Sequence, residues 1–412
     1  MTSNDLYRQI LGLTAPWSVG DVVLDMVAQT VHVYVVHDPL AGRLRCSTCG
    51  RDCPGYDTQE ERTWRHLDTC QLKTFLVCSL PRVECPDHGV RPAEASWTAP
   101  SSRFTLMFEC FAIAVLQATK VQRNAAQMLR LSPNQIHDIM DRAVERGMAR
   151  RDTERVIYRA SLDEKSIAAG HEYMTVLADS SRGIVIEVAD GRTLAATRSL
   201  LRGALSATQR GQIKCVTMDM WRPFADAVKA ELPGAEIAHD PFHIAKYLGT
   251  AVDDTRKAEH ARLTKEGESL LAKSKYIWLK NPANLTSKQN AMLLDLQNSQ
   301  LMTPKVWSFK EAFKEFYKCR KPKSARTFFD NWHEQALALK STHLTKVAHM
   351  LKRHLDGLLA VIKYGASNAI AEAINSKIQA LKTAARGFRR FENYRIAILF
   401  FFGGLDLNPQ LS

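Results

Sequence analysis

The segment Ile213–Asp219, with the sequence IKCVTMD, decides the fold of this chain. Its apolar and β-branched residues predict a buried strand over Ile213–Met218, and a carboxylate follows at once. The pattern then predicts a helix over residues 222–232 and a short strand over residues 236–239. This alternation of strand and helix is typical of an α/β sheet.

Upstream, three segments alternate between apolar and polar residues and predict consecutive strands joined by short turns. They are Val156–Leu162, Tyr173–Ala178 and Gly183–Val188, and this spacing indicates an antiparallel meander. A helix is expected over residues 193–205. The complete order is βββαβαβ, which is the order of an RNase H-like core.

An aspartate stands at the end of three predicted strands. Asp163 and Asp219 follow the first and fourth strands, and Asp240 follows the fifth. Any one of them could be a turn former or a helix cap. Together they predict a shared crevice, because the carboxyl ends of adjacent central strands meet at one edge of an α/β sheet. Neighbouring carboxylates repel each other unless a cation neutralises them, and sparse oxygen ligands favour Mg²⁺ or Mn²⁺.

A further carboxylate is expected on a helix near the C-terminus, SNAIAEAINSKIQ over Ser367–Gln379. Glu372 is its only acid, and Asn368 and Asn375 lie one turn away on the same helical face. This polar row could instead be the solvent-facing stripe of an amphipathic helix. Basic residues follow it, with Arg386 about four turns after Glu372. These candidate phosphate contacts are Lys382, Arg386, Arg389 and Arg390.

Two short cysteine motifs predict a zinc site. Cys46 and Cys49 form a CxxC turn followed by Gly50, and Cys85 and His88 form a CxxH turn. Four such ligands complete the closed tetrahedral coordination of a structural zinc ion. The alternative is a cysteine-rich loop with free thiols.

Other residues near these motifs are either alternative ligands or plain core residues: Cys53, Cys70, Cys78 and His66. A strand is predicted between the two motifs, over Leu72–Val77. The sequence therefore predicts a small β-rich unit that the metal holds together, because so small a core would not be stable alone.

A pair of short helices is predicted after this unit. Residues 122–130 form the first, and Ser132 can cap the second, with Pro133 at its first position and Gln135 closing a capping box. This is the outline of a helix-turn-helix, although helix pairs in bundles have the same pattern. In a DNA-binding unit the second helix would enter the major groove, with three side chains near the bases. These are Asn134, Gln135 and His137.

Composition limits the class of protein. The 412 residues are 45% hydrophobic, enough for two or three cored domains, and no segment is long and apolar enough to span a bilayer. Lys and Arg outnumber Asp and Glu by 56 to 43, which gives a net charge of +13 and favours a polyanionic partner, with nucleic acid ahead of a membrane surface. Nine cysteines and no export signal indicate a cytoplasmic protein.

With these motifs in place, the sequence resembles the DDE transposases of bacterial insertion sequences, specifically the ISL-three type. The resemblance covers nearly the whole chain. It is carried by the zinc motifs, the helix pair and the segments Leu162–Lys165, Asp190–Arg192, Asp219–Met220, Asp240–Lys246, Ser367–Glu372, Asn375–Ile378 and Gly387–Arg389.

The resemblance implies that Asp163, Asp219 and Glu372 are a catalytic triad that binds magnesium or manganese. It implies two-metal cleavage of a phosphodiester at the transposon end and transfer of the freed 3′-hydroxyl to target DNA. Its implied partners are double-stranded DNA and a second copy of the chain, at the bacterial nucleoid and without a membrane.

The chain departs from the family pattern at two places. His88 stands where the family usually has a second CxxC cysteine, which suits zinc equally. Ala369 and Ala373 replace family glycines near Glu372. Asp240 and His243 also match a motif found in several transposase families, where the histidine could orient DNA or a water; a capping aspartate and a core histidine are the alternative.

The predicted architecture is a multidomain α/β protein. Its parts are a zinc-binding β-rich unit (1–98), a helix-turn-helix (99–152), an RNase H-like core in two pieces (153–248 and 365–412) and an all-helical insertion (249–364). One rival function is a DNA-binding regulator on an inactive RNase H-like body, and a weaker one is a structure-selective nuclease. The three acids favour the enzyme over the regulator.

Overall fold

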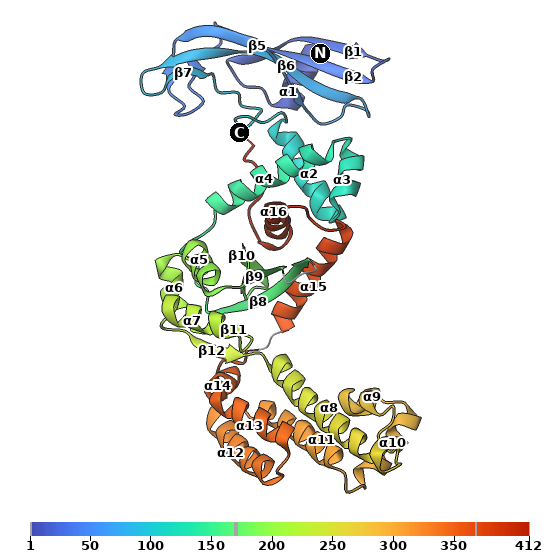
Figure 1. Cartoon of the computed structure of the whole chain (residues 1–412). Helices are drawn as coiled ribbons and strands as arrows, with labels where there is room; N and C mark the ends of the chain where they lie inside the picture. The colour runs from blue at the N-terminus through green and yellow to red at the C-terminus, as the bar shows by residue number, and fades with distance from the viewer. Residues whose placement is uncertain (1, 169–171, 367–368, 412) are drawn as a thin grey trace. The chain divides into compact units, whose positions relative to one another are not determined.

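The structure is a computed structural model that describes residues 2–168, 172–366 and 369–411 (Figure 1). It consists of two compact units. The first contains Met1–Arg151, Leu381–Phe401 and Leu405–Ser412, and the second contains Asp152–Ala380 and Phe402–Gly404. Within the described residues, every helix is too short or too polar to cross a membrane.

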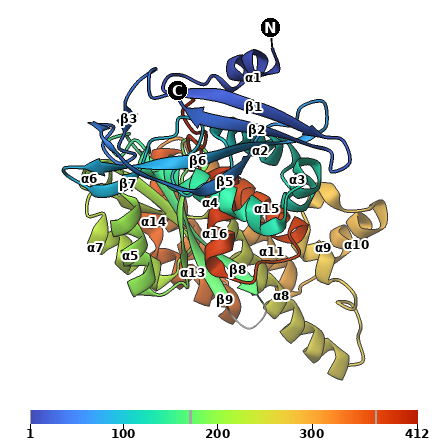
Figure 2. The same cartoon turned by 90° about the horizontal axis from the view of Figure 1, so that it is seen from above.

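The first unit begins with a helix that the sequence analysis did not predict and a β-sheet that is larger than predicted. The helix is α1 (Ser3–Leu11), and five strands form the main sheet: β1 (Trp17–Asp25), β2 (Thr30–His37), β5 (Gly55–Arg65), β6 (Lys73–Cys85) and β7 (Gly89–Pro92). Their order is β1-β2-β6-β5, with β7 paired to β6, and β1 and β2 lie side by side in Figure 2. A second sheet pairs β3 (Leu44–Arg45) with β4 (Asp52–Cys53).

This sheet has its own apolar core, which includes the fully buried Val33, Trp64, Leu76 and Val83. The unit is therefore larger than predicted, and it has an apolar core in addition to the zinc motifs. The predicted strand is part of β6, and the missed hairpin β1–β2 supplies much of the apolar surface. The unit buries enough apolar area to stabilise itself in part.

Four helices complete the first unit: α2 (Leu106–Thr119), α3 (Gln122–Leu129), α4 (Pro133–Ala149) and most of α16 (Phe391–Phe402). The predicted capping box at Ser132 and Gln135 is present. Glu109 of α2 is fully buried and pairs with Arg142 at 2.6 Å and Arg146 at 3.0 Å, both on α4. A buried carboxylate with two guanidinium partners fixes these two helices to each other.

The second unit contains a five-stranded sheet in the order β10-β9-β8-β11-β12. The strands are β8 (Arg159–Ala168), β9 (Glu172–Asp179), β10 (Ile184–Asp190), β11 (Cys215–Met218) and β12 (Glu236–His239). The first three form the predicted antiparallel meander, and β11 is parallel to both β8 and β12. The order of strands and helices is as predicted, apart from one additional short helix, α6.

Asp163 does not follow the end of its strand, which corrects the prediction. It lies inside β8, which continues to Ala168. The reason is that β8 has two neighbours of different length. Pairing with β11 stops near Ser161, whereas antiparallel pairing with β9 extends the strand through Lys165 to Ala168.

Helices cover both faces of this sheet (Figure 1). The helices α5 (Leu194–Ala204) and α7 (Arg222–Glu231) pack on one face with Leu162, Leu177 and Val216, and α6 (Ala207–Gln212) joins them. On the other face, α14 (Leu355–Tyr364) packs against Cys215 and Ala238. Residues of α15 (Ala369–Ala384) lie on this second face too, because Asn375 contacts Asp163.

Between β12 and α15 the chain is helical, as predicted. Residues 249–364, all of them described, contain helices and connecting turns without a strand. The helices are α8 (Pro241–Lys265), α9 (Lys275–Leu279), α10 (Ser287–Gln297), α11 (Met302–Ala312), α12 (Pro322–Ala338), α13 (Thr342–Arg353) and α14, with 3-10 turns at Pro282–Asn284 and Phe313–Lys318. Aromatic side chains such as Phe313, Phe316 and Phe329 fill their common core.

Candidate active site and metal cluster

Three aspartates stand level with one another across three neighbouring strands of the second unit. Thr217 pairs with Ser161, and Met218 pairs with His239, in parallel register. Continuing both registers brings Asp219 level with Asp163 on one side and Asp240 on the other. Residues level on parallel strands point to the same face, so the three carboxylates share the face that carries α14 and α15.

Each aspartate is held in the same way. One carboxylate oxygen accepts the N–H of a residue just after it: Glu164 at 2.8 Å for Asp163, Met220 at 2.6 Å for Asp219 and Phe242 at 2.8 Å for Asp240. The second oxygen is turned toward another side chain. Burial raises the pKa of Asp163, and burial together with the charges of Glu372 and Asp219 raises the pKa of Asp240. A cation among these carboxylates would offset the free-energy cost of keeping them ionised.

His243 lies between two of these carboxylates. Its Nδ1 is 3.3 Å from Oδ2 of Asp219, and its Nε2 is 3.7 Å from Oδ2 of Asp240. The histidine comes from the first turn of α8, which Asp240 caps. The predicted capping role of Asp240 is therefore present, and the histidine is half-exposed beside the site instead of in a core.

The helix α15 joins the site through Asn375. Its Nδ2 donates to Oδ2 of Asp163 at 2.6 Å, and Glu372 lies one turn earlier on the same helix. Glu372 and Asp240 line the same cavity, which has a volume of about 620 Å³. Asn368, the other predicted partner of Glu372, lies outside the described residues.

The zinc motifs of the first unit form a tighter cluster. Ligand atoms of Cys46, Cys49, Cys85 and His88 all lie within 4.8 Å of one another, and in the described part of the chain no other His, Cys, Asp and Glu side chains gather so closely. Gly50 and Gly89 follow the two turns with φ of 68° and 65°, a left-handed conformation that favours glycine. Burial opposes ionisation of Cys85, but hydrogen bonds from His88 and nearby N–H groups lower its pKa to about 6.

The alternative zinc ligands do not complete this cluster. Burial raises the pKa of Cys78 to about 12 within the core, and Cys70 is exposed. Nδ1 of His66 is hydrogen-bonded to the hydroxyl of Thr105 at 2.9 Å. Cys53 lies nearby but turns its thiol to the carbonyl of Arg51 at 3.4 Å. Three sulfurs and one imidazole within this distance suit tetrahedral zinc.

Comparison with known families decides the identity. The sequence model of a family of DDE transposases of the ISL3 type, described as "Transposase", matches residues 161–398. The chain belongs to this family. A second match, to the zinc-finger of transposase IS204/IS1001/IS1096/IS1165, covers residues 43–88 and includes all four clustered ligands.

Individual relatives agree with this assignment of the transposase. One is the transposase for insertion sequence element IS1557 of Mycobacterium tuberculosis, 26% identical over 411 residues that cover 93% of this chain and 92% of that protein. Another is the transposase for insertion sequence element IS1001 of Bordetella parapertussis, 27% identical over 382 residues that cover 91% and 92% of the two chains.

The predicted DNA contacts of the transposase lie in its first unit. Asn134 is exposed at the start of α4 and His137 is half-buried, whereas Oε1 of Gln135 accepts the N–H of Ser132 at 2.9 Å within the capping box. Lys382 is on α15, but the helix ends at Ala384. Three further cations therefore do not continue a helical row from Glu372, which corrects the prediction: Arg386, Arg389 and Arg390.

The chain turns after α15 because Arg386 and Gly387 have φ of 56° and 93°, outside the helical region.

One feature near the aspartates was not predicted from the sequence. Trp221 and Arg192 form a cation–π pair just beyond Asp219 and β10. The tryptophan two residues after Asp219 was the available signal in the sequence.

Proposed function

We propose that this transposase cleaves DNA at the ends of an insertion sequence and transfers the freed 3′-hydroxyl to target DNA at the carboxylate site of its second unit. Asp163, Asp219 and Glu372 are the proposed metal-binding residues. The observation that carries the proposal is the shared register of Asp163 and Asp219, together with the Asn375 contact that docks the Glu372 helix beside them. The fold of this unit is proposed to be RNase H-like.

Magnesium or manganese fits the donor set, because every candidate ligand is a carboxylate oxygen and two of the aspartates are costly to bury without a cation. When bound, a pair of such ions would stabilise charge on the attacking and leaving oxygens of the phosphodiester. The protein itself fixes the carboxylates through backbone N–H groups, and the Asn375 hydrogen bond holds α15 beside them. Asp240 and His243 are proposed to position Asp219, since His243 contacts both aspartates.

The first unit is proposed to bind the terminal inverted repeats. Zinc would hold the CxxC and CxxH turns together. The helices α3 and α4 would act as a helix-turn-helix in which Asn134 and His137 approach bases. Lys382, Arg386, Arg389 and Arg390 would contact phosphates, which position the protein without specifying sequence. The five-part division of the chain made from the sequence is kept as the proposed domain organisation.

Two copies of the transposase are proposed to act together at the nucleoid, because two DNA ends have to be joined to one target. This pairing is expected when DNA is bound, and a symmetric dimer is the simplest arrangement.

The test is cleavage of a duplex that carries the terminal repeat read from the DNA flanking the gene. We expect Mg²⁺-dependent cleavage that leaves a 3′-hydroxyl, lost in Asp163→Asn while repeat binding persists. Sequence-specific binding without cleavage by the unaltered protein would instead support the regulator. Equal cleavage of junctions that lack the repeat would support a structure-selective nuclease.

A further inference from the structure

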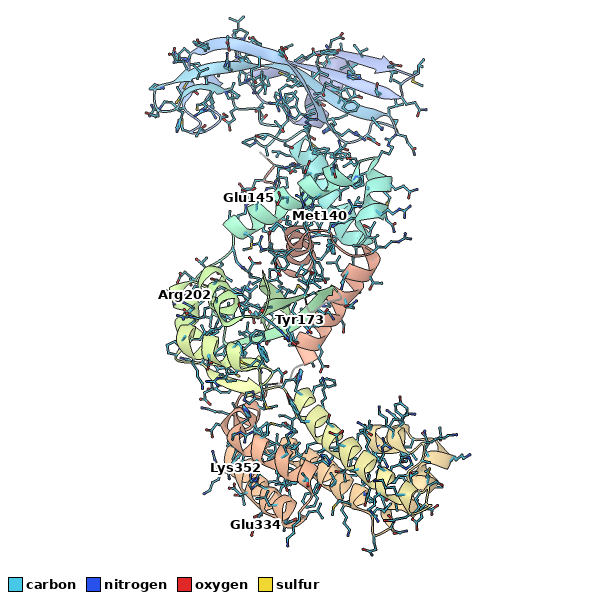
Figure 3. All side chains as sticks on the ribbon, viewed as in Figure 1. Met140, Glu145, Tyr173, Arg202, Glu334 and Lys352 are labelled. Carbon is cyan, nitrogen blue, oxygen red and sulfur yellow. The ribbon has the colours of Figure 1, made fainter. Side chains whose placement is uncertain are left out.

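A cluster of aromatic and charged side chains lies beside the aspartates, on the opposite face of the same sheet. Along β8, Glu164 points away from the face of Asp163, toward the face that holds Leu162 and α7. Tyr173 of β9, which Figure 3 labels, is on this face too, since it pairs with Ser166, two residues after Glu164. Arg192 follows β10, and Trp221 is the N-cap of α7.

The members of this cluster hold one another in place. The guanidinium of Arg192 is 4.0 Å from the ring centroid of Tyr173 and 4.9 Å from that of Trp221. Its Nη1 lies 2.7 Å from a carboxylate oxygen of Glu164. Trp221 Nε1 donates to the carbonyl of Arg192 at 3.3 Å. The indole is therefore fixed before any ligand arrives, which lowers the entropy lost on binding.

Trp221 nevertheless remains 39% exposed. Arg192 is stacked on the ring, and the exposed part of the indole is available to a second planar group. The next residue, Arg222, has a side chain that is 90% exposed. Trp221 makes no side-chain cap bond at the start of α7, so the helix end adds a partial positive charge next to the same spot. Arg222 also pairs with Asp226 at 3.5 Å, but this contact is exposed and leaves the guanidinium accessible. An aromatic surface next to an exposed cation suits a nucleotide.

We propose that Trp221 stacks on one nucleobase next to the scissile phosphate and that Arg222 contacts the adjoining phosphate. This inference rests on the proposed function, because the base is placed by the strand that crosses the carboxylates. Asp219 and Trp221 are separated by one residue at the end of β11, so DNA held at Asp219 lies near the indole, although the two side chains belong to opposite faces of the sheet.

The base that binds Trp221 has to be unpaired, because both faces of a paired base are covered within the duplex. Taking a base out of the stack costs a few kcal/mol. Stacking on an aromatic side chain returns about 1–3 kcal/mol, and the phosphate contact of Arg222 adds to it. The structure thus assigns to Trp221 the local opening of the DNA end at the cleavage point.

The test combines a change in the protein with a change in the DNA. Single-turnover cleavage is measured on repeat duplexes that lack one base in turn, at each of the three positions on either side of the cleaved phosphate and on both strands. Removing the contacted base should slow the unaltered protein roughly 5- to 100-fold. Trp221→Ala should cleave intact DNA more slowly by a similar factor. Removing the contacted base should not slow this variant further. Trp221→Phe should behave nearly as the unaltered protein.

Other variants separate stacking from a structural role. Trp221→Leu retains apolar contact with Arg192 without an aromatic face and should match Trp221→Ala, which covers the case that the alanine variant fails to fold. Tyr276→Ala removes an aromatic that is 62% exposed on α9 and should have no effect. If Trp221→Ala and each missing base slow cleavage by independent factors that multiply at every position, Trp221 has a structural role only and the inference is wrong. If the unaltered protein does not cleave at all, the proposed function fails together with it.

Discussion

The two candidate metal sites of this transposase are built in opposite ways. The zinc cluster takes its four ligands from two tight turns, and its ligand atoms lie within 4.8 Å of one another. The carboxylate site takes Asp163, Asp219 and Glu372 from three remote segments. It depends on strand register and on one hydrogen bond from Asn375, and its ligands are less tightly gathered.

This is the difference expected between a structural site and a reactive one. Closed coordination by side chains leaves no position for a substrate, which suits a metal that stabilises a fold. Loosely gathered carboxylates leave room for water and for phosphate oxygens, as Mg²⁺ requires. The following experiments disturb one site or the other.

The largest effect is expected from removing a zinc ligand. Cys85→Ser should lower the unfolding free energy of the first unit by several kcal/mol, below the about 10–16 kcal/mol that zinc contributes in isolated finger peptides, because this unit has its own core. Hydrogen exchange measured by mass spectrometry should rise around residues 44–93 and not in the second unit. Cys110→Ser, outside the cluster, is the control. Unchanged exchange in Cys85→Ser would show that the cluster is not a structural site.

A change in the carboxylate site should affect activity instead of folding. Asp219→Asn should slow cleavage roughly 1,000-fold or more, because it removes a ligand worth several kcal/mol of transition-state stabilisation. Binding of repeat DNA should change about twofold at most. Asp254→Asn, a half-buried aspartate of α8 that pairs with Lys257 away from the site, should cleave normally. Cleavage by Asp219→Asn at the normal rate would place the reaction elsewhere.

A smaller effect is expected at Asn375. Asn375→Ala removes the amide that holds Asp163, and such outer contacts of metal ligands typically contribute 10- to 100-fold. Cleavage should need more Mg²⁺ for half-maximal rate, which a loss of stability alone would not cause. Asn375→Asp should be worse, since it sets two carboxylates against each other. Ser376→Ala, exposed on the same helix, is the matched control, and equal Mg²⁺ dependence in all variants would contradict this role.

The smallest effect concerns acid stability, which both units should share. Burial lowers the pKa of His66 and of His239 to about 4, against 6.5 in the unfolded chain. The folded state binds fewer protons than the unfolded state, so stability is complete above pH 6.5 and falls as the pH approaches 4. The loss should be roughly 1–2 kcal/mol per histidine between pH 7 and pH 5.

Hydrogen exchange at the two pH values separates these contributions. His66→Gln should reduce the acid sensitivity of the first unit alone, and His239→Gln that of the second unit alone. His349→Gln, an exposed position on α13, should change neither. Acid sensitivity that persists in both buried variants would exclude these histidines as its source.

The sequence predicted a site better when its residues lie close together in the chain than when they come from remote segments. Zinc ligands followed from the CxxC and CxxH spacing, because one turn fixes each pair. The order of strands and helices in the second unit also followed, since alternating apolar residues and turn signals marked the elements. The extension of β8 past Asp163 did not, because it depends on pairing with β9 beyond the length of β11.

Other features depended on contacts that no local pattern encodes. The β1–β2 hairpin had the alternating signal of Thr30–His37 but was overlooked next to the cysteines. The Asn375 bond to Asp163 joins residues far apart in the chain. Arg192 and Trp221 lie well apart in the sequence, and only the fold brings the guanidinium of Arg192 over the ring of Trp221.

The parallel register of β8, β11 and β12 restricts how relatives can vary in length. Adding or deleting one residue within β11 would turn the side chain at position 219 to the opposite face and exchange it for a neighbour such as Met218. Gaps between homologous chains should therefore collect in the connections and in the helical segment after α8, while the distance along the chain from Cys215 to Asp219 stays constant. A search for distant members can treat that short spacing as fixed and allow the connections between strands to vary.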